Sequence, residues 1–138
     1  MHLTQELALL LRARIPVINI VGVDEVRVVR LLEEMAAGRD WPQGQGLYAW
    51  DLADQFHCHR AGNPEFDCKQ QVAPDMLLQK IDEFRGPGTF ILKDFHHVLE
   101  AKKSTIRKLR NLAQKLASVR PEKNIILITP EMKLPPEL

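Results

Sequence analysis

The sequence lacks most of the features that would assign a protein to a special class. Its 138 residues include two cysteines, too few for the disulfide framework of a small secreted domain. No apolar run approaches the roughly 18 residues of a membrane-spanning helix. The N-terminus also lacks the charged region and small-residue cleavage site of a secretory signal. We therefore expect a reducing, cytosolic compartment and no membrane span.

Aromatic side chains and net charge are also scarce. Aromatic residues make up 6% of the chain and the formal net charge is +1, so the molecule as a whole is not a polyelectrolyte. The charge is unevenly spread, because residues 1–100 hold 10 Lys and Arg against 15 Asp and Glu, whereas residues 101–138 hold 9 against 3. The length predicts one domain, over residues 1–130, followed by an extended tail over 131–138.

Two short apolar runs frame the most regular part of the chain. Residues 89–92 and 124–128 are rich in β-branched side chains and bounded by turn residues, which is typical of strands buried on both faces. Between them, residues 105–119 have helical periodicity. A strand, a helix and a strand in this order predict a right-handed parallel βαβ unit. Asp94 and Thr129 follow the two strands, at the edge where open α/β sheets place their sites.

The rest of the chain continues this alternation. Helices are predicted over 3–14, 24–38 and 74–84, and strands over 16–21 and 47–50. In the third of these helices, the side chains predicted to face the core are Met76, Leu77, Ile81 and Phe84. Residues 52–74 are the least regular part, and we expect an excursion on the surface there. Four strands alternating with helices, preceded by one extra helix, predict an α/β fold, a three-layer sandwich with a mostly parallel sheet of about four strands.

The turn after the first strand is where a nucleotide-binding α/β domain would hold phosphates. A P-loop needs a glycine-rich turn, a lysine and a Ser or Thr. Residues 21–26 read VGVDEV, with one glycine, no lysine and no hydroxyl. The carboxylates of Asp24 and Glu25 stand where a triphosphate would lie, and like charges at that distance repel. We therefore expect neither ATP hydrolysis nor a bound cofactor in this chain.

Polar residues at the strand ends are the remaining candidates for a ligand site. The third strand resembles a Walker B strand that closes on Asp94, although Phe95 stands where a second carboxylate would follow. We predict that Asp51, Asp94, Phe95, His96 and Thr129 face a ligand. The alternative is structural, with the aspartate forming a turn and the threonine bonding nearby backbone.

Three aspartates follow strands, namely Asp24, Asp51 and Asp94. If their strands are neighbours in the sheet, the three carboxylates can hold Mg²⁺ and support phosphoryl transfer or nucleic-acid cleavage. Helix capping and turn formation are the alternative. We predict no metal and no catalytic residue, and keep a Mg²⁺-dependent enzyme as an alternative function.

Histidines and cysteines occur in two places. Residues 57–59 read HCH, and Cys68 follows. Structural zinc needs four convergent ligands, but neighbours in an extended chain point to opposite sides, so free thiols and surface histidines are favoured. His96 and His97 follow the third strand. We expect one of them to face the core from the next short helix, and favour surface or capping roles over a general base.

The predicted helix at 105–119 carries a run of cations with no acid between Glu100 and Glu122. The cations are Lys102, Lys103, Arg107, Lys108, Arg110, Lys115 and Arg120. They can meet phosphates, an acidic protein surface or only solvent. No aromatic residue is interleaved, so stacking on single-stranded nucleic acid is not supported. The side chains predicted to bind a protein partner are Lys103, Arg107, Lys108 and Arg110.

Several runs resemble a known family. They are FILKDFHHVLE, IRKLRNLAQKL and IILITPEMKLPPEL, preceded by LLLRARIPVINIVGVDEVRVVRLL and LYAWDL. Over residues 5–56 and 75–138 the chain resembles the N-terminal region of the AAA-type ATPases of cyanobacteria and some algal plastids. The resemblance implies a degenerate P-loop, RecA-like domain that precedes a complete AAA+ module. In this family the ATPase motifs lie in that module, and the LPPEL ending resembles the start of the linker to it.

The same resemblance implies a function. It implies a non-catalytic regulatory or assembly module that docks on a AAA+ module, on a second copy or on a client protein. It also implies the cyanobacterial cytoplasm or plastid stroma, and a part in the control of photosynthesis or carbon use. A nucleic-acid-binding module that uses the basic helix stays open as a further alternative.

Overall fold

In the computed structural model of the chain, residues 3–118 and 123–130 are described. The helices are α1 (Leu3–Arg12), α2 (Glu25–Ala36), α3 (Pro74–Glu83), α4 (Phe95–Ala101) and α5 (Lys103–Leu116), and the strands are β1 (Val17–Val21), β2 (Gly46–Asp51), β3 (Gln55–Arg60), β4 (Gly88–Lys93) and β5 (Lys123–Thr129). The predicted tail over 131–138 and the end of the predicted helix at Val119 lie outside the described residues.

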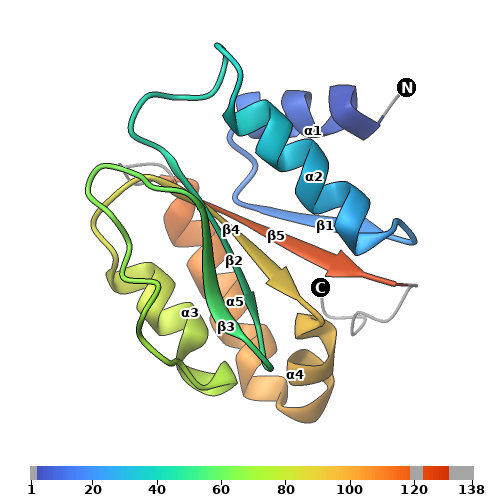
Figure 1. Cartoon of the computed structure of the whole chain (residues 1–138). Coiled ribbons are helices and arrows are strands. Elements are labelled where there is room, and N and C mark those ends of the chain that lie inside the picture. The colour runs from blue at the N-terminus through green and yellow to red at the C-terminus, as the bar shows by residue number, and fades with distance from the viewer. Residues whose placement is uncertain (1–2, 119–122, 131–138) are drawn as a thin grey trace.

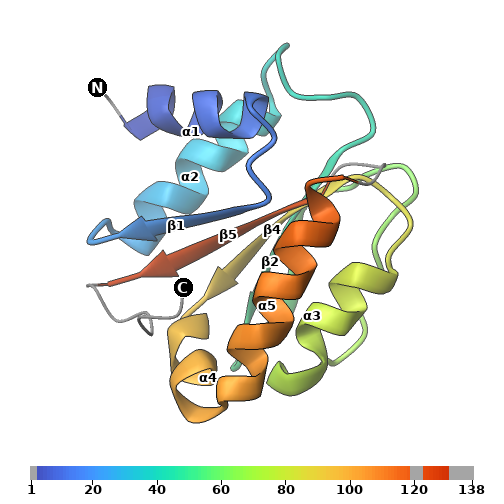
Figure 2. The same ribbon diagram turned by 180° about the vertical axis from the view of Figure 1, so that it is seen from behind.

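The strands form one sheet in the order β1-β5-β4-β2-β3. Strands β1, β5, β4 and β2 run parallel, and β3 pairs with β2 in an antiparallel hairpin. Helices α1 and α2 cover one face, and α3, α4 and α5 cover the other (Figures 1 and 2). The predicted three-layer α/β sandwich with a mostly parallel sheet is confirmed. The predicted βαβ unit is confirmed as well, because β4 and β5 are parallel neighbours joined through α4 and α5.

The sheet separates two apolar cores. In β2, Leu47 and Ala49 pack with α1 and α2, whereas Tyr48 and Trp50 pack with α3, α4 and α5. All of β5 and nearly all of β4 are buried. Both faces of a central parallel strand meet helices, which is why these strands are continuous apolar runs in the sequence.

One cation of the C-terminal third is structural. Lys123 begins β5, and its Nζ donates hydrogen bonds to the carbonyl oxygens of Ile81, Asp82 and Phe84, at 2.9, 3.1 and 2.7 Å. The last carbonyls of a helix lack partners within the helix, and a cation suits that end of its dipole. Burial lowers the pKa of Lys123, and the charge of Asp82 opposes that shift. The contact fixes the end of α3 to the start of β5.

Two predictions about local structure are wrong. The segment expected to be an irregular surface excursion contains β3, and Phe66 beyond it is buried against Tyr48, with ring centroids 5.3 Å apart. On α3, we expected Met76 to face the core, but it is 40% exposed and Leu78 is buried instead. Among the described residues, no helix is long and apolar enough to cross a membrane.

Candidate functional site

The carboxyl ends of β1, β5 and β4 open on a cavity of about 360 Å³. Its charged lining consists of Asp24, Glu25 and Asp94. Burial raises the pKa of Glu25. The charge of Lys93 opposes this shift, while Asp94, Asp51 and Asp24 add to it. The edge of the sheet predicted to hold a site therefore has a hollow with a negative potential.

The strand order separates the three aspartates that follow strands. Strands β5 and β4 lie between β1 and β2, so Asp24 and Asp51 are not on neighbouring strands. Asp24 accepts a hydrogen bond from the N–H of Val26 at 3.2 Å as the N-cap of α2. Asp51 accepts one from the N–H of Asp54 at 2.7 Å in the β2–β3 hairpin. The carboxylate of Asp24 therefore caps a helix and that of Asp51 stabilises a turn, which are the structural roles named above as the alternative to a shared Mg²⁺ site.

Asp94 lies close to the two histidines of α4. It has a left-handed backbone (φ 55°, ψ 23°), and its carboxylate and one ring nitrogen from each of His96 and His97 all lie within 4.8 Å of one another. His96 is buried, whereas Asp94 and His97 are exposed, so the prediction that one histidine faces the core is confirmed. Phe95, which we expected to face a ligand, is buried edge-on against Trp50, with ring centroids 6.4 Å apart.

Thr129 uses its polar groups within the sheet. Its hydroxyl donates to Asn19 Oδ1 at 2.9 Å, and its carbonyl oxygen accepts the N–H of Gly22 at 3.0 Å. The side chain is 1% exposed. Gly22 has a φ of 73°, which suits glycine, and its N–H is the first donor of the turn after β1. These bonds tie the ends of β1 and β5 together.

The cations predicted to bind a partner lie on the solvent side of α5, which Figure 2 shows in front of the sheet. We call Lys103, Arg107, Lys108 and Arg110 the basic face; all four are exposed. Within residues 3–118 and 123–130, none of the four forms an ion pair or a side-chain hydrogen bond. The opposite side of α5, with Ile106, Leu109, Leu112 and Leu116, is buried in the core. The amphipathic pattern predicted for this helix is confirmed.

A groove of about 280 Å³ lies between α3 and α5, and Lys108 stands at it together with Asn111 and Leu78. Two other cations of this region are paired. Lys115 lies 2.9 Å from Asp82, and Lys102 lies 3.7 Å from Asp75, both acids belonging to α3. Such exposed pairs contribute little stability, about 0–1 kcal/mol each. Because of these ion pairs, Lys102 and Lys115 do not count among the cations without an ion partner.

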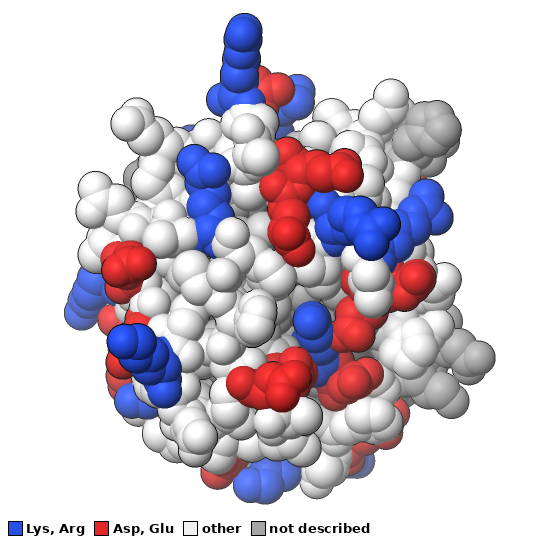
Figure 3. Space-filling view, in the orientation of Figure 1, with Lys and Arg blue, Asp and Glu red and all other residues white. Residues whose placement is uncertain are grey.

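The view in Figure 3 shows a different charge distribution on the side that carries α2 and β3. Cations and anions are interspersed there, and neither sign forms a continuous patch. A surface of mixed charge has no strong electrostatic potential of one sign that would steer a charged partner toward it. The basic face of α5 is distinct in this respect.

Strand β3 divides the cysteine and histidine segment between two sides of the sheet. The rings of His57 and His59 are 5.5 Å apart, and His59 Nδ1 lies 3.3 Å from a carboxylate oxygen of Glu33 on α2. Burial raises the pKa of the Cys68 thiol to about 12, and the neighbouring Cys58 adds to this rise. This alternation, expected for an extended chain, keeps the four side chains from converging.

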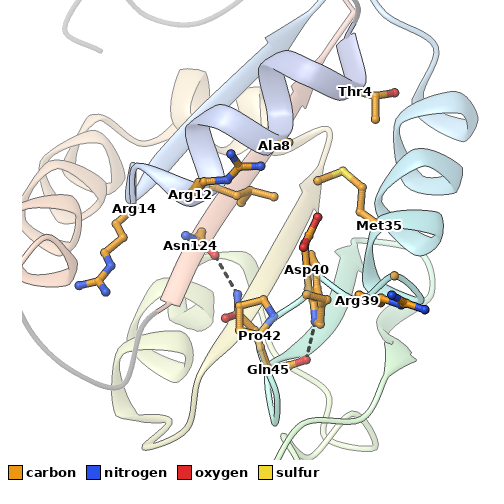
Figure 4. A pocket seen from close by; sticks show the side chains of 13 residues that line it. Thr4, Ala8, Arg12, Arg14, Met35, Arg39, Asp40, Pro42, Gln45 and Asn124 are labelled. Carbon is orange, nitrogen blue, oxygen red and sulfur yellow. Dashed lines mark hydrogen bonds between the residues drawn. The ribbon is translucent and has the colours of Figure 1, made fainter.

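A larger cavity, of about 460 Å³, lies at the opposite edge, between α1 and the connection from α2 to β2 (Figure 4). Gln45 Nε2 donates to Thr89 Oγ1 at 2.9 Å and to Asn124 Oδ1 at 3.3 Å, and this buried amide network forms the cavity floor. Figure 4 shows Arg14 and Arg39 pointing away from each other. No local sequence pattern indicated this cavity, because its walls come from three separate parts of the chain, residues 4–14, residues 35–45 and Asn124.

Comparisons with known proteins support the resemblance seen in the sequence. Residues 3–138 match the family described as the N-terminal domain of SpoVK-like AAA ATPases. Proteins named "Uncharacterized AAA domain-containing protein ycf46" are similar over nearly the whole chain. The protein from Trieres chinensis is 31% identical over 140 residues, covering 100% of this chain and 26% of the relative. The proteins from Pyropia yezoensis and Guillardia theta are each 31% identical over 137 residues, covering 98% of this chain and 26% and 25% of the relatives.

The chain spans about a quarter of the length of these relatives. No solved structure matches it at a significant level. The family match covers every described element from α1 to β5. The chain therefore belongs to the family of N-terminal domains of SpoVK-like AAA ATPases.

Proposed function

We propose that this domain is a non-catalytic docking module that binds a AAA+ ATPase module through the basic face of α5. The observation that carries the proposal is the set of four exposed cations on one helix that have no ion partner among the described residues. Unpaired charges of one sign favour a partner surface of the other sign and speed its association. The groove beside Lys108 adds apolar area from Leu78 and Leu112 to the same surface.

The AAA+ module is the partner that the comparisons favour. The relatives are named as AAA domain-containing proteins, and this chain matches only about a quarter of their length. A domain that works beside an ATPase module has that module at a high effective concentration, in the same chain or in a neighbouring subunit. A weak electrostatic contact is enough for docking under these conditions.

Features of the carboxyl edge support a non-catalytic role. The N–H of Gly22 is engaged by the carbonyl of Thr129, and the carboxylates of Asp24 and Glu25 line the adjoining cavity. Both features oppose a triphosphate at this turn, which needs N–H donors and positive charge. The separation of Asp51 from Asp24 also weakens the alternative of a Mg²⁺-dependent enzyme.

The test is charge reversal on the basic face. Arg107→Glu/Lys108→Glu is compared with Arg27→Glu/Arg30→Glu, an equal charge change at exposed positions on α2 across the sheet. Calorimetry measures the Kd of each variant for the separately produced AAA+ module that is the proposed partner. We expect the α5 variant to bind at least about tenfold more weakly, equivalent to about 1.4 kcal/mol. The Kd of the α2 variant should stay within about threefold of the wild-type Kd, because charges outside an interface contribute little to affinity.

Two results would count against docking through α5. One is an unchanged Kd for the α5 variant, and the other is an equal loss for both variants, which indicates a general charge effect. Fluorescence anisotropy with labelled single-stranded and duplex oligonucleotides tests the nucleic-acid alternative. Tight binding that falls steeply with salt and with Arg107→Glu would favour that alternative.

A further inference from the structure

We propose that Asp94, His96 and His97 form a binding site for a divalent transition-metal ion, for which zinc has the best-matched chemistry. The three side chains offer one carboxylate oxygen and two imidazole nitrogens, whose atoms lie within 4.8 Å of one another. Two nitrogen donors and one oxygen donor suit Zn²⁺ and its neighbours in the first transition row, whereas Mg²⁺ and Ca²⁺ prefer oxygen ligands alone. Among the described residues, this is the group of three such ligands that could hold one ion.

The geometry requires only small side-chain movements. Zinc bonds of about 2.0–2.1 Å in tetrahedral array place ligand atoms about 3.4 Å apart. Closing from at most 4.8 Å to that spacing takes movements of about 1 Å, which rotations about the side-chain bonds of Asp94 and His97 supply because both are exposed. His96 is 3% exposed and its position is set by packing. The site therefore has one fixed ligand and two that can adapt.

The backbone brings the carboxylate to the histidines. Asp94 is in the left-handed region, with φ 55°, which costs free energy for a residue other than glycine. Its side chain makes no capping hydrogen bond to α4, so the carboxylate is not used in the usual role of an aspartate before a helix. This distinguishes Asp94 from Asp24 and Asp51, whose carboxylates accept backbone N–H groups.

The surroundings favour a cation. Asp94 also lines the cavity that holds Asp24 and Glu25. A divalent ion at Asp94 would reduce the repulsion among these carboxylates. Three protein ligands leave a fourth position for water or a ligand atom, the arrangement of zinc sites that stay open to solvent.

The second histidine pair of the chain provides a matched control. His57 and His59 lie on β3 with ring centroids 5.5 Å apart, and they belong to no group of three ligands within the described chain. The thiols of Cys58 and Cys68 are the other soft donors of this segment. Replacing either pair changes the same ligand chemistry without touching the proposed site.

The experiment measures Zn²⁺ binding to the metal-stripped chain by competition with a chromophoric chelator. We expect one equivalent of Zn²⁺ to bind in the micromolar range or tighter. Asp94→Asn and His97→Gln should each weaken binding at least about tenfold, while His57→Gln/His59→Gln and Cys58→Ser/Cys68→Ser should leave it unchanged. Both test positions in the site are exposed, and thermal melting without metal checks that the variants fold.

Cobalt supplies a second readout. Co²⁺ bound by two imidazoles and a carboxylate gives visible d–d absorption without the near-ultraviolet band of thiolate ligation, and His97→Gln should abolish the visible bands. The proposal is overturned if no Zn²⁺ binds, or if binding is insensitive to Asp94→Asn and His97→Gln. It is also overturned if the β3 histidine or cysteine variants remove the binding, because the ion then lies elsewhere.

Discussion

The hydroxyl of Tyr48 fixes the segment after β3 to the sheet, and Tyr48→Phe removes that hydroxyl alone. The oxygen accepts the N–H of Gly62 at 3.1 Å and the N–H of Phe66 at 3.2 Å. The tyrosine is fully buried, and its ring lies 5.3 Å from the rings of Phe66 and Phe90, centroid to centroid. These ring contacts survive the substitution. The variant therefore isolates the contribution of two hydrogen bonds.

The expected loss of unfolding free energy is about 2 kcal/mol. Each neutral hydrogen bond contributes about 1 kcal/mol net, and a buried donor left without an acceptor costs about 1–3 kcal/mol. The N–H of Phe66 is buried and bears that cost, whereas the N–H of Gly62 lies in a partly exposed region where water can replace the hydroxyl. For a domain of this size, about 2 kcal/mol lowers Tm by about 7 °C.

Urea unfolding followed by tryptophan fluorescence measures the change, since both tryptophans are buried. Amide hydrogen exchange gives a local readout. The amide of Phe66 should exchange much faster in the variant. The exchange rates of the β5 amides should change only by the amount that the change in global stability predicts. A loss below about 0.5 kcal/mol, together with an unchanged exchange rate at Phe66, would show that the hydroxyl does not hold this segment.

Three further predictions concern polar groups that are buried or half-buried. Lys123→Met removes three hydrogen bonds to the last carbonyls of α3, and urea unfolding should show a loss of about 2–4 kcal/mol; a loss like that of a surface lysine contradicts the capping role. With a pKa of about 12, Cys68 is thiolate in only about one molecule in ten thousand at pH 8, so mass spectrometry after brief iodoacetamide treatment should find Cys58 labelled and Cys68 spared. Burial lowers the pKa of His59 despite Glu33, so the unfolded chain binds the proton more readily. The contribution of His59 to the free energy of unfolding is full above pH 6.5 and falls as the pH drops from there to the pKa of His59 in the folded chain. His59→Gln should therefore flatten this part of the plot of unfolding free energy against pH.

The architecture could be predicted because the buried parallel strands have no polar face. Strands β4 and β5 are apolar runs between turn residues, and Pro74 and Asp24 begin helices in the sequence as they do in the structure. Strand β3 has none of these signals. It lies at the edge of the sheet, Phe56 is its only buried side chain, and the hairpin turn leads into Gln55 with a φ of 65° rather than an Asn-Gly pair. An edge strand of this kind is held by its partner, not by its own pattern.

The site residues were harder to predict because their roles depend on strand order. Nothing in the sequence shows that β5 and β4 separate β1 from β2, and this order alone decides that Asp24 and Asp51 serve different turns. The same holds for Lys123, whose hydrogen-bond partners lie 39–42 residues earlier in the chain. His96 and His97, by contrast, were visible as neighbours of Asp94. What the sequence could not show is the left-handed turn that carries the carboxylate to them.

The two proposed sites lie at opposite ends of one short path through the structure. The proposed metal ligands stand at the start of α4. Lys102 is both the C-cap of α4 and the N-cap of α5, and the basic face begins at the next residue. Helix α4 also packs on α5 and β5, so a shift at its start reaches the helix that carries Arg107. Any effect of a bound ion on docking must be matched by an equal effect of docking on ion affinity, because the coupling free energy is shared. A measured coupling shows that the two sites communicate, whereas independence of the two affinities shows that α5 is held by its own core contacts at Ile106 and Leu109.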